Sequence, residues 1–183
     1  MSELVDKLFA IHDSLTQAGL AHAFGGAIAL AYCTEEPRGT RDLDVNIFVD
    51  AAKAEVALSA LPDGVAVTDE KVASVIRDGQ TRLRWDDIPV DVFLNNMPLH
   101  EAVAGAVVWV PLEGREIPVL DCASLAIFKA FFDRTKDWAD LEAVAEATPE
   151  DIEAAAATIS DLVGPDDPAV KRLEQLAIPS YRR

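Results

Sequence analysis

The chain has 183 residues, of which 50% are hydrophobic and 26% are charged, a balance typical of a folded globular protein and unlike that of a disordered or fibrous one. No apolar run approaches the roughly 18 residues of a membrane span, and the N-terminal stretch lacks the features of a signal peptide, so we expect a cytoplasmic protein with no membrane partner. The 32 acidic and 16 basic residues sum to a net charge of −16, which excludes a broadly basic nucleic-acid-binding surface and confines any such contact to a local patch.

Hydrophobic spacing and turn residues divide the first 120 residues into helices and strands. Ser2 is positioned to cap the first helix, and the diglycine Gly25-Gly26 is positioned to turn a short strand into the second helix. In chain order, the pattern predicts a helix ending at Gly19, a strand over 21–24, a helix over 27–33, a strand over 41–50, helices over 51–60 and 69–78, a hairpin of strands over 81–85 and 88–94, and a second hairpin within 107–120.

The C-terminal third shows helical periodicity only. Pro149 is positioned to open one helix, Gly164-Pro165 to close it, and Pro168 to start a last short helix. These elements predict an α+β protein with a mixed β-sheet core flanked by helices over residues 1–120. A helical region over 121–183 is expected to pack on that core as part of a single compact unit.

Two aspartates in the strand predicted over 41–50 are separated by one residue. Because strand side chains alternate, Asp42 and Asp44 point to the same face. Carboxylates about 5 Å apart repel by about 3 kcal/mol at an effective dielectric constant near 20. A divalent cation offsets that repulsion, and hard oxygen ligands suit Mg2+. Asp91 interrupts the apolar strand predicted over 88–94 and is the third candidate ligand.

Each of these carboxylates also has a purely structural interpretation. Asp42 and Asp44 can lie on an exposed face without any ligand. Asp91 can pair with a buried arginine on the neighbouring strand, either Arg82 or Arg84. The sequence leaves these alternatives open.

The candidate phosphate-binding groups are the diglycine and one lysine. Gly25-Gly26 lets the backbone approach a ligand and turns the first helical N–H groups toward an anion, or else forms only a tight turn. Lys129 lies in an otherwise apolar run. It must therefore reach the surface, pair with Asp133 one helical turn further on, or contact a bound phosphate.

The cysteines and histidines show no pattern of a metal site or of nucleophilic catalysis. Cys33 and Cys122 lie in apolar stretches without CxxC spacing, so we expect buried thiols with no metal or redox role. His12, His22 and His100 have no spacing typical of a metal site or a triad. A hydrolase is therefore weakly supported.

The order of these features resembles the motif of the nucleotidyltransferase fold superfamily. The features are a strand, a diglycine, a helix, a strand with the pattern R-x-T-x-D-x-D, and a later strand that carries an aspartate. The stretch PRGTRDLDV is similar to the branch of AbiEii-type and MenT-type toxins, with aminoglycoside nucleotidyltransferases more distant. The segment REIPVLDCASLAIFKAFFDRTKDWADLEAV is similar to that branch's lysine-bearing helix, followed by K-D and a second aspartate. The resemblance spans roughly residues 20–145. The loop before Asp42 is expected to be slightly longer than the corresponding loop of this motif usually is.

The resemblance implies an enzyme that transfers a nucleoside monophosphate from a nucleoside triphosphate (NTP) to an acceptor hydroxyl, with pyrophosphate leaving. It assigns Asp42, Asp44 and Asp91 as ligands of two Mg2+ ions, or of Mn2+ in their place, with Asp91 on the acceptor side. Lys129 joins these aspartates as a catalytic residue. The nucleotide-binding residues that the resemblance implies are Gly25, Gly26, Arg38, Thr40, Lys129, Lys136 and Asp137, with Asp140 shaping the site.

We expect a toxin-type enzyme with a tRNA acceptor, and a cationic small molecule is the alternative acceptor. The toxin branch implies a tRNA acceptor and a cognate antitoxin partner, and the short layout favours it. The candidates for the basic track that tRNA requires are Arg38, Arg41, Lys136, Lys171, Arg172, Arg182 and Arg183. The acidic balance fits an aminoglycoside-like acceptor better, and its candidate contacts are Glu35, Glu36, Asp86 and Asp87. A further alternative is an inactive nucleotidyltransferase-like module that only binds ligands.

Overall fold

The computed structural model describes residues 2–37, 39–97 and 99–178. The contacts between residues divide the chain into two compact units. The first, here called the sheet unit, comprises Met1–Ile28 and Gly39–Val119, and the second, the helical unit, comprises Ala29–Arg38 and Leu120–Arg183. The expected division of the chain at residue 120, and the packing of its two parts on each other, stay predictions.

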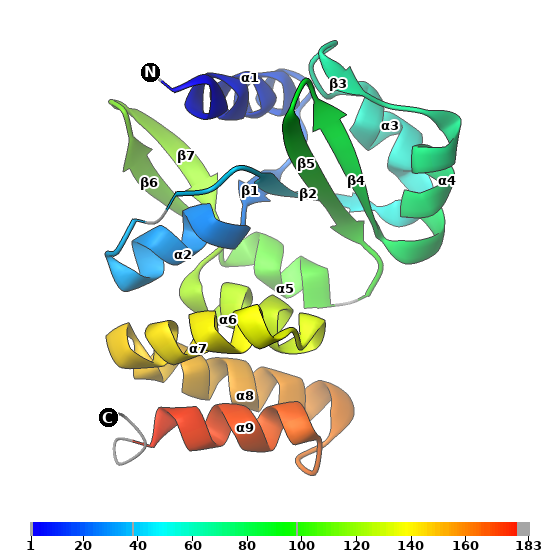
Figure 1. The fold of residues 1–183 in the computed structure, drawn as a ribbon. Helices are drawn as coiled ribbons and strands as arrows, with labels where there is room; N and C mark the ends of the chain where they lie inside the picture. Colours follow the sequence, from blue (N-terminus) through cyan, green and yellow to red (C-terminus); the bar gives the residue numbers. More distant parts are fainter. Residues whose placement is uncertain (1, 38, 98, 179–183) are drawn as a thin grey trace. The chain divides into compact units, whose positions relative to one another are not determined.

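Within the described residues, seven strands form one mixed sheet in the order β3-β4-β5-β2-β1-β7-β6 (Figure 1). The strands are β1 (His22–Phe24), β2 (Leu43–Asp50), β3 (Val65–Ala66), β4 (Gln80–Trp85), β5 (Ile88–Asn95), β6 (Val108–Leu112) and β7 (Arg115–Val119). The pairs β2–β5 and β1–β7 are parallel, and the other neighbours are antiparallel. This sheet confirms the mixed β-sheet core of the expected α+β fold.

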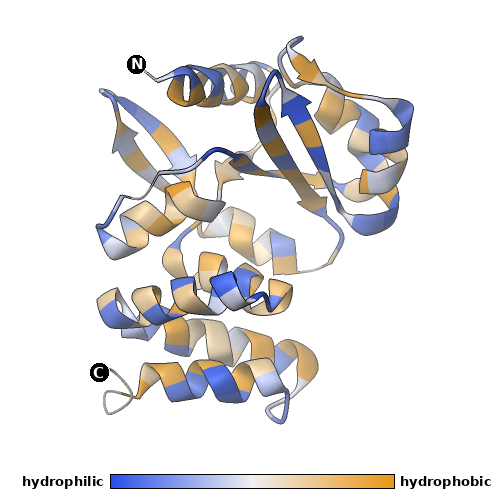
Figure 2. Cartoon of the chain, viewed as in Figure 1, coloured by the Kyte–Doolittle hydropathy of each residue, from blue (hydrophilic) through white to orange (hydrophobic). Residues whose placement is uncertain are grey.

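Alternation of buried and more exposed residues fixes which face of the central strands meets the core. In β2, Leu43 and Val45 are fully buried, and in β5, Val90 and Val92 are fully buried. The residues between them face the other way. Figure 2 shows the corresponding alternation of hydrophobic and hydrophilic residues along β4. A shift of one residue would exchange the two faces, so the hydrophobic pattern fixes the register.

The helices of the sheet unit are α1 (Glu3–Gln17), the short 3-10 helix η1 (Ala51–Lys53), α3 (Ala54–Ser59), α4 (Asp69–Asp78) and α5 (Leu99–Gly105). The helix α2 (Gly26–Thr34) begins in the sheet unit and ends in the helical unit. Ser2 caps α1 as expected, because its hydroxyl accepts a hydrogen bond from the N–H of Val5. The helix α4 contacts β4, while α3 and α5 contact β2.

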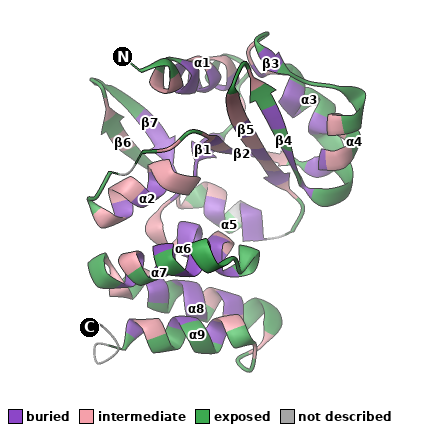
Figure 3. Ribbon diagram, viewed as in Figure 1, coloured by how far each residue is buried: buried purple, intermediate pink, exposed green. Residues whose placement is uncertain are grey.

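The helical unit contains α6 (Cys122–Phe132), α7 (Thr135–Ala147), α8 (Pro149–Val163) and α9 (Pro168–Ala177). The helix α6 contacts α7, α8 and α9, and α8 also contacts α9. Their facing sides are buried and their outer sides exposed (Figure 3). Pro149 and Pro168 lie in the first turns of α8 and α9, as predicted, because a first-turn residue needs no N–H donor. No helix in the described part of the chain is long and apolar enough to span a membrane.

The prediction that Cys33 and Cys122 are buried thiols is wrong. Cys33 at the end of α2 and Cys122 at the start of α6 form a disulfide, with their Cα atoms 5.6 Å apart, inside the helical unit. Cysteine spacing could not indicate this pair, because 89 residues separate the two positions and only the folded chain brings them together.

Candidate functional site

Three aspartates of the sheet unit, Asp42, Asp44 and Asp91, make up what we call the carboxylate row. Asp44 in β2 and Asp91 in β5 are direct register partners in the parallel pair, so their side chains lie on the same face of the sheet. Asp42 lies one residue before β2 and is likewise partly exposed. The structure thus brings together the aspartates that the sequence singled out, although their role as metal ligands stays a prediction.

The diglycine lies against this row. A Cβ atom on Gly26 would lie only 1.9 Å from Oδ2 of Asp44, and Gly26 has a left-handed φ of +54°. The N–H of Gly25 donates a hydrogen bond of 2.9 Å to the backbone carbonyl of Asp44. Gly26 is therefore required both by its conformation and by the close approach of the carboxylate.

Thr40 orients the first aspartate of the row. Its hydroxyl donates to Oδ1 of Asp42 at 2.8 Å and lies 3.1 Å from the backbone carbonyl of Asp42. The structure thus shows Thr40 acting on Asp42, whereas the resemblance implied contact with the nucleotide. Arg38, the other residue expected in this loop, lies outside the described residues.

Arg82 is bound to the other end of the row. It is the register partner of Asp91 in the antiparallel pair β4–β5. Its Nε donates to Oδ1 of Asp91 at 2.7 Å and its Nη2 donates to Oδ2 at 2.6 Å. The same Nη2 lies 3.8 Å from Oδ2 of Asp42. The alternative that Asp91 pairs with Arg82 is confirmed, but the arginine is exposed rather than buried.

The neighbouring aspartates stabilise the positive charge of Arg82. The pKa of Arg82 lies above its usual value, first because of the side-chain hydrogen bonds to Asp91 and the charge of that residue. The charges of Asp42 and Asp44 add smaller contributions. The Asp91 side chain is 17% exposed and that of Arg82 is 58% exposed, so the pair lies at the surface of the sheet, open to solvent on the arginine side. Sequence reasoning did not anticipate that one guanidinium contacts two members of the row.

The carboxylates of Asp42 and Asp44 are suitable donors for one hard divalent ion, because Mg2+ is usually held by one or two carboxylates together with substrate phosphates. In the described residues, no group of three or more His, Cys, Asp or Glu side chains is arranged to hold a metal ion. The bidentate hydrogen bonds of Arg82 also engage both oxygens of Asp91. The donor set therefore fits a single ion better than the two that the resemblance implies.

Lys129 is part of a buried ion-pair network in the helical unit. Its Nζ lies 2.6 Å from Oδ2 of Asp140 and 3.6 Å from Oδ1 of Asp137. Arg134 binds the same Asp137, with Nε at 2.5 Å from Oδ2. Lys129, Asp137 and Asp140 are each less than 7% exposed. The network satisfies these charges internally, so contact of Lys129 with phosphates stays a prediction.

One expectation about this segment changes. The pairing of Lys129 with Asp133 is wrong, because Asp133 accepts a hydrogen bond of 2.6 Å from Nε1 of Trp138 and Lys129 turns to α7. Burial alone would raise the pKa of Asp137, but hydrogen bonds from Arg134 and the charge of Lys129 outweigh burial and hold that pKa below its usual value. Lys136 is exposed.

The candidate acceptor-binding residues are mostly exposed, but several have partners within the chain. Lys171 pairs with Asp166 at 2.8 Å, and the guanidinium of Arg172 lies 3.8 Å from the ring centre of Trp138. Asp86 pairs with Lys7 at 2.8 Å. Glu35, Glu36, Arg41 and Asp87 are exposed, whereas Arg182 and Arg183 lie outside the described residues.

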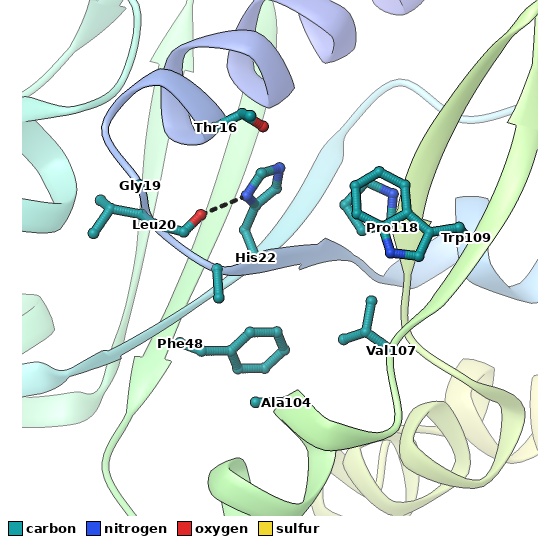
Figure 4. Close-up of a pocket in the computed structure, with 10 residues that line it drawn as sticks. Thr16, Gly19, Leu20, His22, Phe48, Ala104, Val107, Trp109 and Pro118 are labelled. Carbon is teal, nitrogen blue, oxygen red and sulfur yellow. Dashed lines mark hydrogen bonds between the residues drawn. The ribbon is translucent and has the colours of Figure 1, made fainter.

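Two cavities in the sheet unit are lined by residues other than the carboxylate row. One, of about 480 Å³, lies between the end of α1 and strands β1 and β6, where Trp109, Phe48 and His22 line it (Figure 4). His22 donates from Nδ1 to the carbonyl of Leu20 at 2.9 Å, and its Nε2 lies 2.9 Å from Nδ1 of His12. The other, of about 960 Å³, lies beside Asp50 and Asn95, the last residues of β2 and β5.

Comparison with known proteins supports the fold assignment. No family model matches the sequence, and no curated protein matches it. The chain is similar to the solution structure of the antibiotic-resistance factor ANT(2'')-Ia, with 14% identity, a TM-score of 0.59, and 87% of this chain and 92% of that chain covered. The crystal structure of ANT(2'')-Ia in complex with adenylyl-2''-tobramycin has 12% identity, a TM-score of 0.57 and coverages of 96% and 95%.

A third similar structure is an antigenic nucleotidyltransferase-like protein from Paracoccidioides brasiliensis, with 15% identity, a TM-score of 0.52, and 92% of this chain and 91% of that chain covered. These structural neighbours are nucleotidyltransferases or nucleotidyltransferase-like proteins. At such low identity the likeness concerns the fold. The chain therefore has the nucleotidyltransferase-like fold that the sequence motifs predicted.

Proposed function

We propose that this protein is a Mg2+-dependent nucleotidyltransferase that transfers a nucleoside monophosphate from an NTP to an acceptor hydroxyl. The observation that supports it most is the adjacency of Asp44 and Asp91 on neighbouring parallel strands, with Gly26 packed against the Asp44 carboxylate. A fold alone does not define a function, but these residues occupy the order and the positions of the motif that the resemblance identifies.

Each part of the site has a role in this proposal. A divalent ion bound by Asp42 and Asp44 would neutralise charge on the triphosphate. The N–H of Gly25 is already bonded to the carbonyl of Asp44, so the backbone N–H groups from Gly26 onward, where α2 begins, would face phosphate oxygens. The acceptor oxygen forms a bond to the α-phosphorus, the bond from that phosphorus to its bridging oxygen breaks, and pyrophosphate leaves with the electron pair. Asp91 would take the proton of the acceptor hydroxyl.

Charge favours a cationic small molecule as the acceptor. The net charge of −16 repels a polyanion. Two of the basic residues considered for a tRNA track, Lys171 and Arg172, are engaged with Asp166 and Trp138. One of the similar structures, ANT(2'')-Ia, is a complex with adenylyl-2''-tobramycin, a nucleotidylated aminoglycoside. We therefore place an aminoglycoside-like polyamine first, and a tRNA acceptor with a toxin-type role and a cognate antitoxin second.

The test is a transfer assay with each α-labelled NTP, Mg2+ or Mn2+, and either total cellular RNA or a panel of aminoglycosides. A labelled aminoglycoside supports the acceptor proposed here. Labelled RNA supports the toxin-type enzyme instead. If neither is labelled by the wild-type protein, the transferase proposal is overturned and the ligand-binding module remains.

The matched variants are Asp44→Ala and Glu55→Ala. Asp44→Ala removes a carboxylate of the row and is expected to lower transfer by at least about 100-fold. Glu55→Ala removes an exposed carboxylate from α3 and should leave transfer unchanged. Transfer that persists undiminished in Asp44→Ala would overturn the metal-site assignment, provided that circular dichroism shows both variants folded.

A further inference from the structure

Arg82 occupies the place where an ion shared by Asp91 and Asp42 would have to lie. Its Nη2 lies 2.6 Å from Oδ2 of Asp91 and 3.8 Å from Oδ2 of Asp42. A Mg2+ ion shared by these carboxylates would need to approach oxygens of both to about 2.1 Å. The guanidinium and such an ion cannot occupy this space together.

The charges lead to the same conclusion. The carboxylate row has three negative charges close together, and a guanidinium is always protonated at physiological pH. Arg82 also forms the two-pronged contact that matches a carboxylate best, which fixes the orientation of Asp91 as well as offsetting its charge. A divalent ion at the acceptor side would have to displace this contact and add a further positive charge beside the arginine.

We propose that Arg82 serves as a built-in cation in place of a second divalent ion at the acceptor side of the row. This inference rests on the proposed function and specifies its metal requirement. The protein then binds a single divalent ion, at Asp42 and Asp44. Asp91 stays without metal, and Arg82 is a positioning residue that holds its carboxylate toward the acceptor.

The chain provides a matched control on the same strand. Arg84 lies two residues further along β4, on the same face as Arg82, and is also exposed. Its register partner is Pro89 rather than an aspartate. Arg84→Ala therefore removes an equal charge from the same face without releasing Asp91.

The experiment counts Mn2+ ions bound per chain, from the loss of the free Mn2+ signal in electron paramagnetic resonance. The proteins compared are the wild type, Arg82→Ala, Arg82→Lys and Arg84→Ala. We expect a single ion for the wild type and for Arg84→Ala. Arg82→Ala should bind a second ion at least about tenfold more tightly than the wild type does, because Asp91 becomes available. Arg82→Lys, which keeps the charge, should resemble the wild type. If Arg82→Ala does not fold, the polar but uncharged Arg82→Gln replaces it.

Each outcome bears on this inference separately from the proposed function. Two tight ions in the wild type, an unchanged count in Arg82→Ala, or no Mn2+ binding at all would overturn the inference. The transfer assay decides the proposed function independently. If the wild type binds one ion but labels no acceptor, the transferase proposal is refuted and the role of Arg82 is retained. If the wild type binds two ions and labels an acceptor, the role of Arg82 is refuted and the transferase proposal is retained.

Discussion

Gly26 and Asp44 approach so closely that a Cβ atom on the glycine would lie 1.9 Å from Oδ2 of the aspartate. The contact joins the first residue of α2 to the second residue of β2. The diglycine turn and the carboxylate row are thus parts of one arrangement, in which a change at the turn displaces a candidate metal ligand.

Gly26→Ala is expected to displace the Asp44 carboxylate and to strain the left-handed backbone at φ +54°. The expected destabilisation is about 1–3 kcal/mol, and transfer should fall by about 100-fold because the carboxylate moves. Thermal melting and the labelled-transfer assay measure the two effects. Gly105→Ala is the control, since its Cβ would meet no atom within 4 Å. Equal stability and transfer in the two variants would contradict the close approach.

Lys129→Met tests whether the buried lysine holds the helical unit together. The change leaves Asp137 and Asp140 buried with one cation fewer, which should lower the free energy of unfolding by about 3–5 kcal/mol. Denaturant titration measures it. Lys136→Met, on the exposed side of α7, should stay within about 0.5 kcal/mol of the wild type. A Lys129→Met protein as stable as the Lys136→Met protein would rule out the structural role.

Stability should decrease as the pH falls below the ordinary histidine pKa. Burial lowers the pKa values of His12 and His22 from 6.5 in the folded protein. Above pH 6.5 both states hold the rings neutral. Below it the unfolded chain binds more protons, so the free energy of unfolding falls as the pH drops toward the folded pKa values, by at most about 1.4 kcal/mol per pH unit for each ring.

Denaturant titrations between pH 7.5 and 5 would measure this slope, with His12→Gln as the comparison. This variant removes one titrating ring and should reduce the slope. An identical slope in both proteins would show that burial does not lower the pKa of His12.

The disulfide should add to stability under oxidising conditions. Cys33→Ser removes a cross-link between residues 89 positions apart and is expected to lower the free energy of unfolding by about 2–4 kcal/mol. Thiol titration of the denatured, unreduced wild type should find neither Cys33 nor Cys122 free. Adding a reductant to the wild type should reproduce the variant's stability. If the reductant has no effect on the wild type, the cross-link does not form in solution.

Local patterns predicted most of the elements. The Ser2 cap, the first-turn prolines of α8 and α9, and the two hairpins all depend on residues close together in the sequence. A short strand and a short helix, β3 and α5, went unpredicted. With two and seven residues, they are too short to show a period of their own.

The pairing of Arg82 with Asp91 could have been predicted from the sequence. The hairpin β4–β5 turns through two residues, Asp86 and Asp87. Counting back an equal number of residues on each side of this turn pairs Arg82 with Asp91. Both Arg82 and Arg84 lie on the strand beside Asp91, but the two-residue turn favours Arg82 as its partner.

The sequence by itself determined most of the helices and strands and that Asp42 and Asp44 share a face, because both follow from periods of a few residues. Only the tertiary structure decided that Asp44 and Asp91 are neighbours, since β2 and β5 pair in parallel across a long connection. It also selected Asp140 as the partner of Lys129 and joined Cys33 to Cys122. Such contacts depend on how distant segments pack, and no local spacing specifies that packing.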